Sequence, residues 1–415
     1  MLDHFIANRT AVERLCPGVM GAHLESFVEH LIGLEYAPTT VRSQLHSLGR
    51  LDRWMARRHL GVADLSEAVI ARFLRGRARG AGGHRSDAPT LRRFLAHVRR
   101  HGATGPAPHR RDESPLGLLV RQYEHYLTVE RGLAPATLTN YGGFVRQFLT
   151  ERFGASRMQL GELDASDISR FVLRHAHTMS PGRAKLMVTA LRSLLRFLFA
   201  RGAIARDLAA CVPAVANWRL ATVPKYLRPE EVDRLLRTCD RTTAVGRRNY
   251  AVLLLLARLG LRAGEVVTLE LDDIHWRVGE LAVRSSKGHH HDRLPLPADV
   301  GEALAAYAHA DRPRHPLRRV FLCARAPRRG FAGPSTVDTI VRRALDRAGL
   351  RPPLQGAHLL RHSLATRLLR EGASLTEIGQ VLRQRAVATT EIYAKVDLAG
   401  LRALGRPWPA SGDAR

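Results

Sequence analysis

Apolar residues recur at helical spacing along most of the chain, and this pattern predicts a mainly α-helical protein. Residues 36–74 and 133–173 follow one plan: an Ala-Pro-x-Thr signature, an amphipathic helix, a loop and a second helix. The prolines of the two signatures, Pro38 and Pro135, are 97 residues apart. The pattern indicates a duplicated helical unit, although the shared chemistry of helix starts explains a match of this size as well.

The pattern changes after about residue 228, where a strand signal joins the helical ones. The run AVLLLLA at 251–257 indicates a buried helix, because it is far shorter than a bilayer span. Leu281 and Val283 then alternate with other positions in strand fashion, and KGHHHD supplies a turn before a return strand. We therefore expect a C-terminal domain of the α+β class, mainly α with a small β-hairpin, preceded by all-α modules.

Two stretches of low periodicity divide the chain. The first, GATGPAPHRRDESPLG at 102–117, combines Gly, Pro and mixed charge as linkers do, and the second spans 212–229. The expected parts are an N-terminal helical domain (1–105), a linker (106–116), a second helical domain (117–205), a linker (206–227) and a C-terminal domain (228–415).

The charge balance points to a polyanionic partner. The chain carries 65 basic and 38 acidic residues, a net charge of +27, and DNA or RNA is the first candidate. No apolar run can span a bilayer and the N-terminus lacks a signal-peptide pattern, so we expect a cytoplasmic protein without a membrane partner. The four cysteines lack metal-ligand spacing, and the adjacent side chains of His289–His291 point in different directions, so we expect no metal.

Arginine greatly outnumbers lysine among the basic residues. Only Lys185, Lys225, Lys287 and Lys395 are lysines, against 61 arginines. Arginine serves wherever a permanent charge suffices, whereas lysine can readily give up a proton. A lysine that is kept in such a chain is therefore a candidate for proton transfer.

Candidate DNA-facing residues lie on the second helical unit. In the helix expected over 180–202, leucines form an apolar stripe and basic side chains lie off it. Such a face is often merely solvated, but in a chain this positive a DNA-facing surface is an equal alternative. The candidates are Thr137, Arg146, Arg183, Lys185 and Arg192.

Four places in the C-terminal domain indicate one site. Arg262 follows the buried apolar helix, Lys287 lies on the hairpin tip, and Tyr393 follows a Thr-Thr pair. His358 and Arg361 stand three residues apart and so share a helix face. Each alone is weak evidence, because most arginines are surface charges and most tyrosines pack half-buried.

Taken together and in this order, these residues resemble the tyrosine recombinase (phage integrase) family. GLRAGEV matches the first arginine box of the family, SSKG its lysine hairpin, HLLRHSLAT its second arginine box and TTEIYAKV its nucleophile motif. The resemblance covers residues from about 115 to 408, and 115–205 is similar to the helical core-binding module of the family. Several boxes in the family's order are far more specific than any one box.

The resemblance implies a DNA transesterification that needs no metal or cofactor. Arg262 and Arg361 would bind the non-bridging oxygens of the scissile phosphate, where the transition state gathers negative charge. Tyr393 would attack the phosphorus and form a 3′-phosphotyrosyl intermediate, which retains the bond energy for rejoining. Lys287 would protonate the departing 5′ oxygen, and His358 would accept a proton or a hydrogen bond near the phenol.

Gln384 departs from the family pattern, which has His or Trp at this position of a Leu-Gly-His-Ser motif. An amide still donates a hydrogen bond to a phosphate oxygen, but it cannot carry charge. The departure keeps open a non-catalytic DNA-binding accessory subunit of the same fold. A type IB topoisomerase-like enzyme also stays open because it shares the chemistry, although the core-binding module and the short tail favour recombination.

The resemblance also implies that the partner is double-stranded DNA and that the protein assembles on it. We expect a homo-oligomer, a tetramer of protomers on two paired sites, with other recombinases as further candidate partners. The N-terminal unit would be an extra DNA clamp, an arm-site domain or a partner-binding domain. The tail, with Leu398, Leu401 and Leu404 at helical spacing, either closes its own core or docks on a neighbouring protomer.

Overall fold

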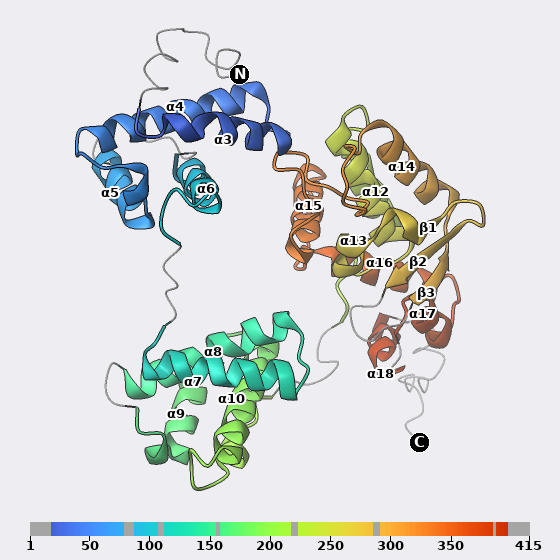
Figure 1. Cartoon of the computed structure of the whole chain (residues 1–415). Coiled ribbons are helices and arrows are strands. Elements are labelled where there is room, and N and C mark those ends of the chain that lie inside the picture. Colours follow the sequence, from blue (N-terminus) through green and yellow to red (C-terminus); the bar gives the residue numbers. More distant parts are fainter. Residues whose placement is uncertain are drawn as a thin grey trace, which may run out of the picture. The chain divides into compact units, whose positions relative to one another are not determined.

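The chain forms helices and one small sheet over the part that the computed structural model describes (Figure 1). This architecture confirms the expected fold class. The described residues are 18–78, 87–106, 112–154, 158–216, 223–284, 291–384 and 387–396.

The first four labelled helices form a bundle with its own core. Phe27, Leu48 and Phe94 are fully buried in this core. Helix α4 begins at a proline, which suits the first turn because the missing N–H has no helical partner there. The elements are α3 (Gly21–Gly33), α4 (Pro38–Ala56), the 3₁₀ turn η1 (Val62–Asp64), α5 (Glu67–Ala78) and α6 (Asp87–Arg100).

A second bundle follows, and its last helix buries the expected leucine stripe. Leu191, Leu194, Leu195 and Leu198 are fully buried in α10. The stretch expected as a linker at 206–227 begins with a 3₁₀ turn whose apolar side chains join this core. The elements are α7 (Pro115–His125), the π turn η2 (Tyr126–Glu130), α8 (Pro135–Phe153), η3 (Leu160–Glu162), α9 (Ala165–Ala176), α10 (Pro181–Ala200) and η4 (Leu208–Cys211).

The two bundles share one element plan. Helices α4 and α8 each span 19 residues from a proline, and α5 and α9 each span 12 residues after a 3₁₀ turn. Helices α6 and α10 end alike, since Gly102 and Gly202 have φ of 69° and 67°. In both, the next amide donates to a carbonyl five residues back at 2.9 Å, Ala103 to Val98 and Ala203 to Leu198. The likeness of the two sequence segments therefore extends through the bundles.

The C-terminal part is built around α12 (Ala244–Arg258), in which residues 251–257 are all buried, as the apolar run predicted. A three-stranded antiparallel sheet of order β1-β2-β3 joins it, with Leu281 opposite Leu294. The strands are β1 (Ile274–His275), β2 (Glu280–Arg284) and β3 (His291–Pro295), which confirms the expected hairpin. The other elements are α11 (Pro229–Arg237), α13 (Ala263–Thr268), η5 (Leu271–Asp273), α14 (Ala298–Ala310), α15 (Pro334–Arg347), α16 (Ala357–Arg370), α17 (Leu375–Val381), α18 (Val387–Thr390) and η6 (Glu391–Val396).

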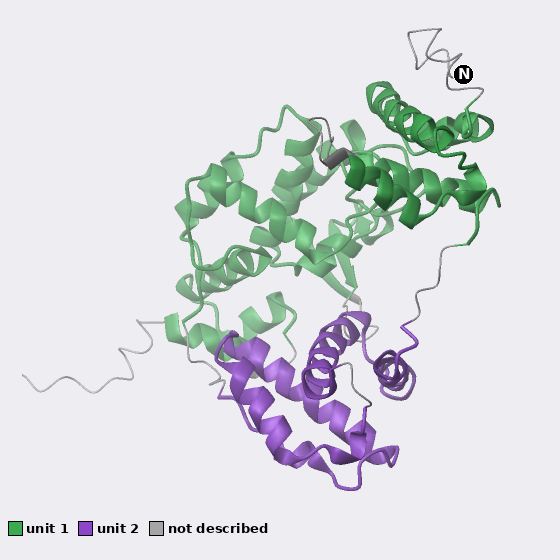
Figure 2. Cartoon of the chain, turned by 90° about the vertical axis from the view of Figure 1, so that its left-hand side faces the viewer, with its two compact units in different colours: residues 1–107, 222–415 green, residues 108–221 purple. Residues whose placement is uncertain are grey.

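Contacts divide the chain into two compact units (Figure 2). One comprises residues 108–221, and the other comprises residues 1–107 together with 222–415. Within the second of these, the apolar cluster of α3–α6 is distinct from the clusters of the C-terminal part. The three-domain division inferred from the sequence, with boundaries at 105, 117, 205 and 228, remains a prediction.

Candidate active site

Arg262 lies at the N-cap of α13, directly after the turn that ends α12. Its backbone amide donates to Glu265 Oε2 at 2.8 Å, and its Nη1 donates to Glu265 Oε1 at 2.7 Å. The turn needs Gly260, because φ is 56° there and an added Cβ would come within 2.7 Å of a Leu382 methyl group. The local sequence therefore fixes Arg262 through a glycine turn and a capping carboxylate.

Arg361 is buried in α16, with 3% of its surface exposed. Its two terminal nitrogens donate to the carbonyl oxygens of Gly260 and Leu382, which come from the turn before α13 and the end of α17. Burial, and then the neighbouring Arg262 and Arg383, lower the pKa of Arg361 to about 10. The guanidinium stays charged at neutral pH and is held by backbone oxygens, so it is positioned before any anion binds.

Arg383 is a third arginine at this place, and it directly precedes Gln384, the residue that departs from the family motif. It has φ of 54°, and its side chain is 5% exposed. It donates to Glu265 Oε2 at 2.8 Å, while its carbonyl oxygen accepts from Arg262 Nη2 at 3.4 Å. Burial alone would raise the pKa of Glu265, but Arg383 and Arg262 together hold it below its ordinary value. The sequence did contain a signal for Arg383, because the family motif has glycine at this position.

Tyr393 lies in η6 and is 1% exposed. Its hydroxyl is 2.9 Å from Nδ1 of His362, and the two rings meet edge to face at 5.6 Å. Burial raises the pKa of Tyr393, against the smaller opposing effects of Arg361 and Gln384. The tyrosine is therefore a buried, neutral phenol at physiological pH.

His362 was missed by sequence reasoning, which chose His358 from the same HLLRH motif. His362 is half-buried, and burial, His358 and Arg361 lower its pKa to about 4, so it is neutral at physiological pH. His358 is exposed one turn earlier in α16, and the centres of the two imidazole rings are 6.3 Å apart. Helical spacing within HLLRH could not identify His362 as a site residue. Its partner, Tyr393, lies in a different element, η6.

Gln384 lies beside these groups. Its Oε1 accepts a hydrogen bond from the Thr390 hydroxyl at 2.8 Å. Gln384 and Arg383 line an open pocket of about 270 Å³, and so does Asp292 of β3, whose carboxylate is 4.0 Å from Arg383 Nε. The return strand of the hairpin therefore reaches the site. Lys287, on the tip of that hairpin, lies outside the described residues, as do Leu398, Leu401 and Leu404 of the tail.

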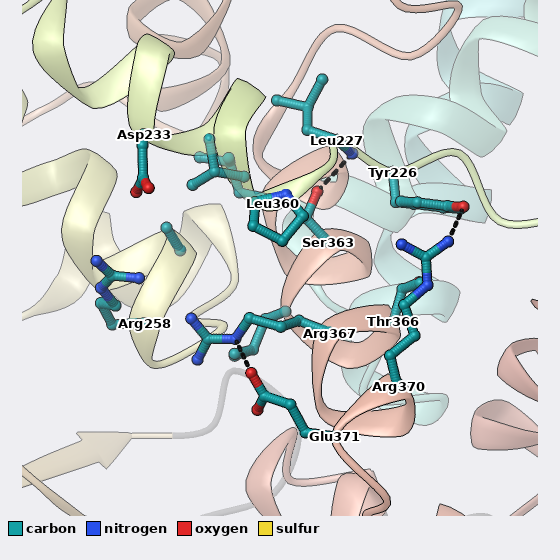
Figure 3. A pocket seen from close by; sticks show the side chains of 14 residues that line it. Tyr226, Leu227, Asp233, Arg258, Leu360, Ser363, Thr366, Arg367, Arg370 and Glu371 are labelled. Atoms are coloured by element: carbon teal, nitrogen blue, oxygen red, sulfur yellow. Dashed lines mark hydrogen bonds and ion pairs between the residues drawn. The ribbon is translucent and has the colours of Figure 1, made fainter.

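A second, more enclosed cavity of about 310 Å³ lies between α11, α12 and α16 (Figure 3). The Ser363 hydroxyl accepts from the Leu227 amide at 2.8 Å, and Arg370 donates to the Tyr226 hydroxyl at 2.6 Å. These bonds attach the segment before α11 to the helix that carries Arg361 and His362. The cavity adjoins the side of α16 that bears Arg367 and Arg370.

The five candidate DNA-facing residues all lie on α8 and α10. Thr137 is half-buried in the first turn of α8, while Arg146, Arg183 and Lys185 are exposed. Arg146 pairs with Asp112 at 3.4 Å, and Arg192 donates to the Val212 carbonyl at 2.9 Å. Their contact with DNA remains a prediction.

Over the described ranges, no group of three His, Cys, Asp or Glu side chains is arranged to hold a metal ion. None of the helices found there is both long enough and apolar enough to cross a membrane.

Comparison with known proteins agrees with the geometry. The phage integrase family matches residues 225–399, and the phage integrase N-terminal SAM-like domain matches residues 120–202. A putative integrase/recombinase y4rA of Sinorhizobium fredii is 43% identical over 98% of this chain and 99% of the relative. Tyrosine recombinase XerD of Lacticaseibacillus casei is 30% identical over 66% of this chain and 92% of the relative.

The fold also resembles a solved structure of the XerH site-specific recombinase in a post-cleavage complex with its palindromic difH substrate. The TM-score is 0.56 at 19% identity, covering 81% of this chain and 93% of the other. The chain thus belongs to the tyrosine recombinase (phage integrase) family and is a DNA-binding site-specific recombinase that cleaves and rejoins strands through a 3′-phosphotyrosyl intermediate.

Proposed function

We propose that Tyr393 is the nucleophile and that Arg262 and Arg361 bind the non-bridging oxygens of the scissile phosphate. The observation that carries the proposal is the convergence of α13, α16 and η6 on one place. There Arg361 lies close enough to Tyr393 and Arg262 to influence the pKa of the tyrosine and to have its own lowered by Arg262. Two neighbouring guanidiniums, of which that of Arg361 acts on the buried phenol, match the charge that develops in phosphoryl transfer.

His362, rather than His358, handles the phenol proton in this proposal. With Nε2 protonated, the free Nδ1 accepts a hydrogen bond from the Tyr393 hydroxyl. In the free protein the proton stays on the phenol, because burial raises the pKa of Tyr393 while the pKa of His362 is lowered to about 4. A bound phosphodiester brings negative charge, which raises the pKa of His362 and lets it accept the proton as the phosphorus–oxygen bond forms.

The remaining roles rest on position in the motif. Lys287 protonates the departing 5′ oxygen, so that the bond from phosphorus to that oxygen breaks as the bond to Tyr393 forms. Gln384 donates its amide to a phosphate oxygen in place of the usual His or Trp. His358, exposed at the start of α16, contacts the phosphate from the solvent side. Rejoining is the reverse reaction with a new 5′ hydroxyl.

Assembly follows from strand exchange between two sites. We propose a tetramer on paired DNA sites, and other recombinases as further partners. Lambda integrase dimers bound to a core site have a similar fold, and by analogy they support assembly on DNA. The enzyme acts in the cytoplasm, where reducing conditions suit the free thiols of Cys211, Cys239 and Cys323.

A covalent trapping assay tests the proposal. The protein is mixed with nicked suicide duplexes, drawn from the DNA flanking its gene and from a random library, and the products are denatured in SDS. We expect a protein–DNA adduct that disappears in Tyr393→Phe, and the trapped strands identify the target sequence. Binding without any adduct would contradict the proposal and support the accessory DNA-binding subunit.

A further inference from the structure

Arg383 follows α17 in a backbone conformation that favours glycine. Its φ is 54°, in the left-handed region, where a side chain costs conformational energy. The family motif has glycine at this position. The Arg383 side chain is nonetheless buried, with 5% of it exposed. Both the strain and the burial of a charge cost stability, so the arginine is expected to contribute an interaction that glycine cannot make.

The carboxylate beside Arg383 does not neutralise the arginines around it. Glu265 accepts from Arg383 Nη2 at 2.8 Å and from Arg262 Nη1 at 2.7 Å. Arg383 Nε is buried and makes no hydrogen bond within the described residues, and Asp292 Oδ2 lies 4.0 Å from it. Arg361 adds a third guanidinium to the group. Three arginines against one buried carboxylate leave a net charge of +2, which the half-exposed Asp292 reduces in part.

The next residue in the chain, Gln384, is uncharged. Its Oε1 accepts from the Thr390 hydroxyl at 2.8 Å, and a hydrogen bond from Gln384 lowers the pKa of Tyr393 against the larger effect of burial. Arg383 and Gln384 line the same pocket of about 270 Å³. A glycine followed by a histidine, as in the family motif, can place a positive charge on the second residue. This chain has the reverse pair, a charged first residue and a neutral second one.

The charge of Arg383 reaches the residues proposed to bind the phosphate. After burial and Arg262, Arg383 is the next cause of the lowered pKa of Arg361, so the two guanidiniums act on each other. The Arg383 carbonyl oxygen accepts from Arg262 Nη2 at 3.4 Å, and the preceding Leu382 carbonyl oxygen accepts from Arg361. Two successive backbone oxygens thus bind the two arginines. A fixed charge in such a buried place acts strongly on its neighbours, because water screens it little.

From this arrangement we propose that Arg383 is a positioning residue which supplies, from the preceding place in the chain, the positive charge that Gln384 lacks. It acts through Glu265, which orients Arg262, and through its electric field at the scissile phosphate, without touching the substrate. The inference rests on the proposed function, in which this site binds that phosphate. Its consequence is that a histidine at position 384 increases the cleavage rate most where Arg383 is absent.

The test is a double-mutant cycle in the covalent trapping assay, with the full-length protein at one salt concentration. Arg383→Gly removes the side chain and leaves the carbonyl oxygen that accepts from Arg262. We expect single-turnover cleavage to slow by roughly a hundredfold, with DNA affinity near wild type because other phosphate contacts supply most of it. Adding Gln384→His should return the rate to within about threefold of wild type, although the same change gains only roughly tenfold in the wild-type protein.

The matched control combines Gln384→His with His362→Gln, a slow variant that keeps Arg383. There the histidine should gain only what it gains in the wild type. Urea denaturation of each variant separates charge from packing. Gln384→His leaves Glu265 without its second arginine, so it should restore the rate of Arg383→Gly but not its stability. If Arg383 were merely structural, rate and stability would stay lowered together, and that result overturns the inference.

A second pair of variants keeps a long side chain on the same backbone. Arg383→Lys retains the charge and should lose less than about tenfold in rate, whereas Arg383→Gln should lose roughly a hundredfold. Equal rates for these two variants, or the same gain from histidine in every background, also overturn the inference. A wild-type protein that forms no Tyr393-dependent adduct would overturn the proposed function itself, and the role of Arg383 with it.

Discussion

Arg383 and Arg262 both donate hydrogen bonds to the buried carboxylate of Glu265, although they lie 121 residues apart in the chain. Arg383 donates to Oε2 at 2.8 Å and Arg262 to Oε1 at 2.7 Å. Arg383 also adopts the left-handed backbone conformation in which the family motif has glycine. Through Glu265, Arg383 therefore stabilises the position of Arg262, which is proposed to bind the phosphate.

Replacing Arg383 with glycine should destabilise the C-terminal part even though glycine suits the backbone better. Relief of the left-handed conformation gains about 1 to 2 kcal/mol. Loss of the guanidinium leaves Glu265 buried with one partner, and breaking a buried pair costs about 3 to 5 kcal/mol. We expect a net loss of about 2 kcal/mol in the free energy of unfolding, measured by urea denaturation.

Two further variants separate the causes. Arg383→Gly combined with Glu265→Gln should lose less stability than the sum of the single changes, because no buried charge is left unpaired. Arg383→Lys keeps a charge near Glu265 but cannot form the same fork. A fully stable Arg383→Gly protein would contradict the account, since Arg262 alone would then satisfy the carboxylate.

The depressed pKa of Glu265 predicts an acid-sensitive contribution to stability. Below its unfolded value of about 4.5 the unfolded chain takes up a proton that the folded carboxylate resists. This contribution is therefore complete above about pH 4.5 and is lost as the pH falls through the lower folded pKa. We expect Glu265→Gln to be less stable than wild type at pH 7, with a difference that shrinks in acid. Urea denaturation from about pH 3 to 7 measures it.

The sequence identified the fold class because helical spacing and the strand alternation at Leu281 and Val283 are local signals. The motif boxes likewise identified Arg262, Arg361 and Tyr393, which the fold brings near one another. His362 and Arg383 could not be ranked this way, because their importance comes from partners 31 and 118 residues away in the chain. Such pairings depend on how α13, α16, α17 and η6 pack, and no local periodicity encodes them.

Gln384→His should raise the rate of strand cleavage. The glutamine carbonyl is occupied by the Thr390 hydroxyl, and the side chain lines an open pocket of about 270 Å³ that has room for an imidazole. A charged or more strongly polarised donor stabilises the phosphorane-like transition state better than a neutral amide. We expect a gain of roughly tenfold in single-turnover trapping, with DNA affinity unchanged. An unchanged rate would mean that the amide already serves the phosphate fully.

His362→Gln should slow cleavage by roughly a hundredfold, because the Tyr393 hydroxyl loses its nitrogen acceptor and its orientation. The matched control is His358→Gln, on the same helix but exposed. We expect the control to lose much less activity, and a larger loss in His358→Gln would transfer the proton-accepting role to His358. DNA affinity, measured at the same salt concentration, should change in neither variant, since neither removes a permanent charge.

A measurement of stability against pH tests the protonation state of His362 independently of its effect on catalysis. Its folded pKa of about 4 lies below the ordinary value of 6.5, so the unfolded chain binds a proton that the folded chain does not as the pH falls below 6.5. The wild type should therefore lose up to about 1.4 kcal/mol per pH unit between these values through this group. His362→Gln should lack that part of the slope in urea denaturation. Identical slopes in the two proteins would show that His362 titrates normally, and its neutral, hydrogen-bonded role beside Tyr393 would have to be abandoned.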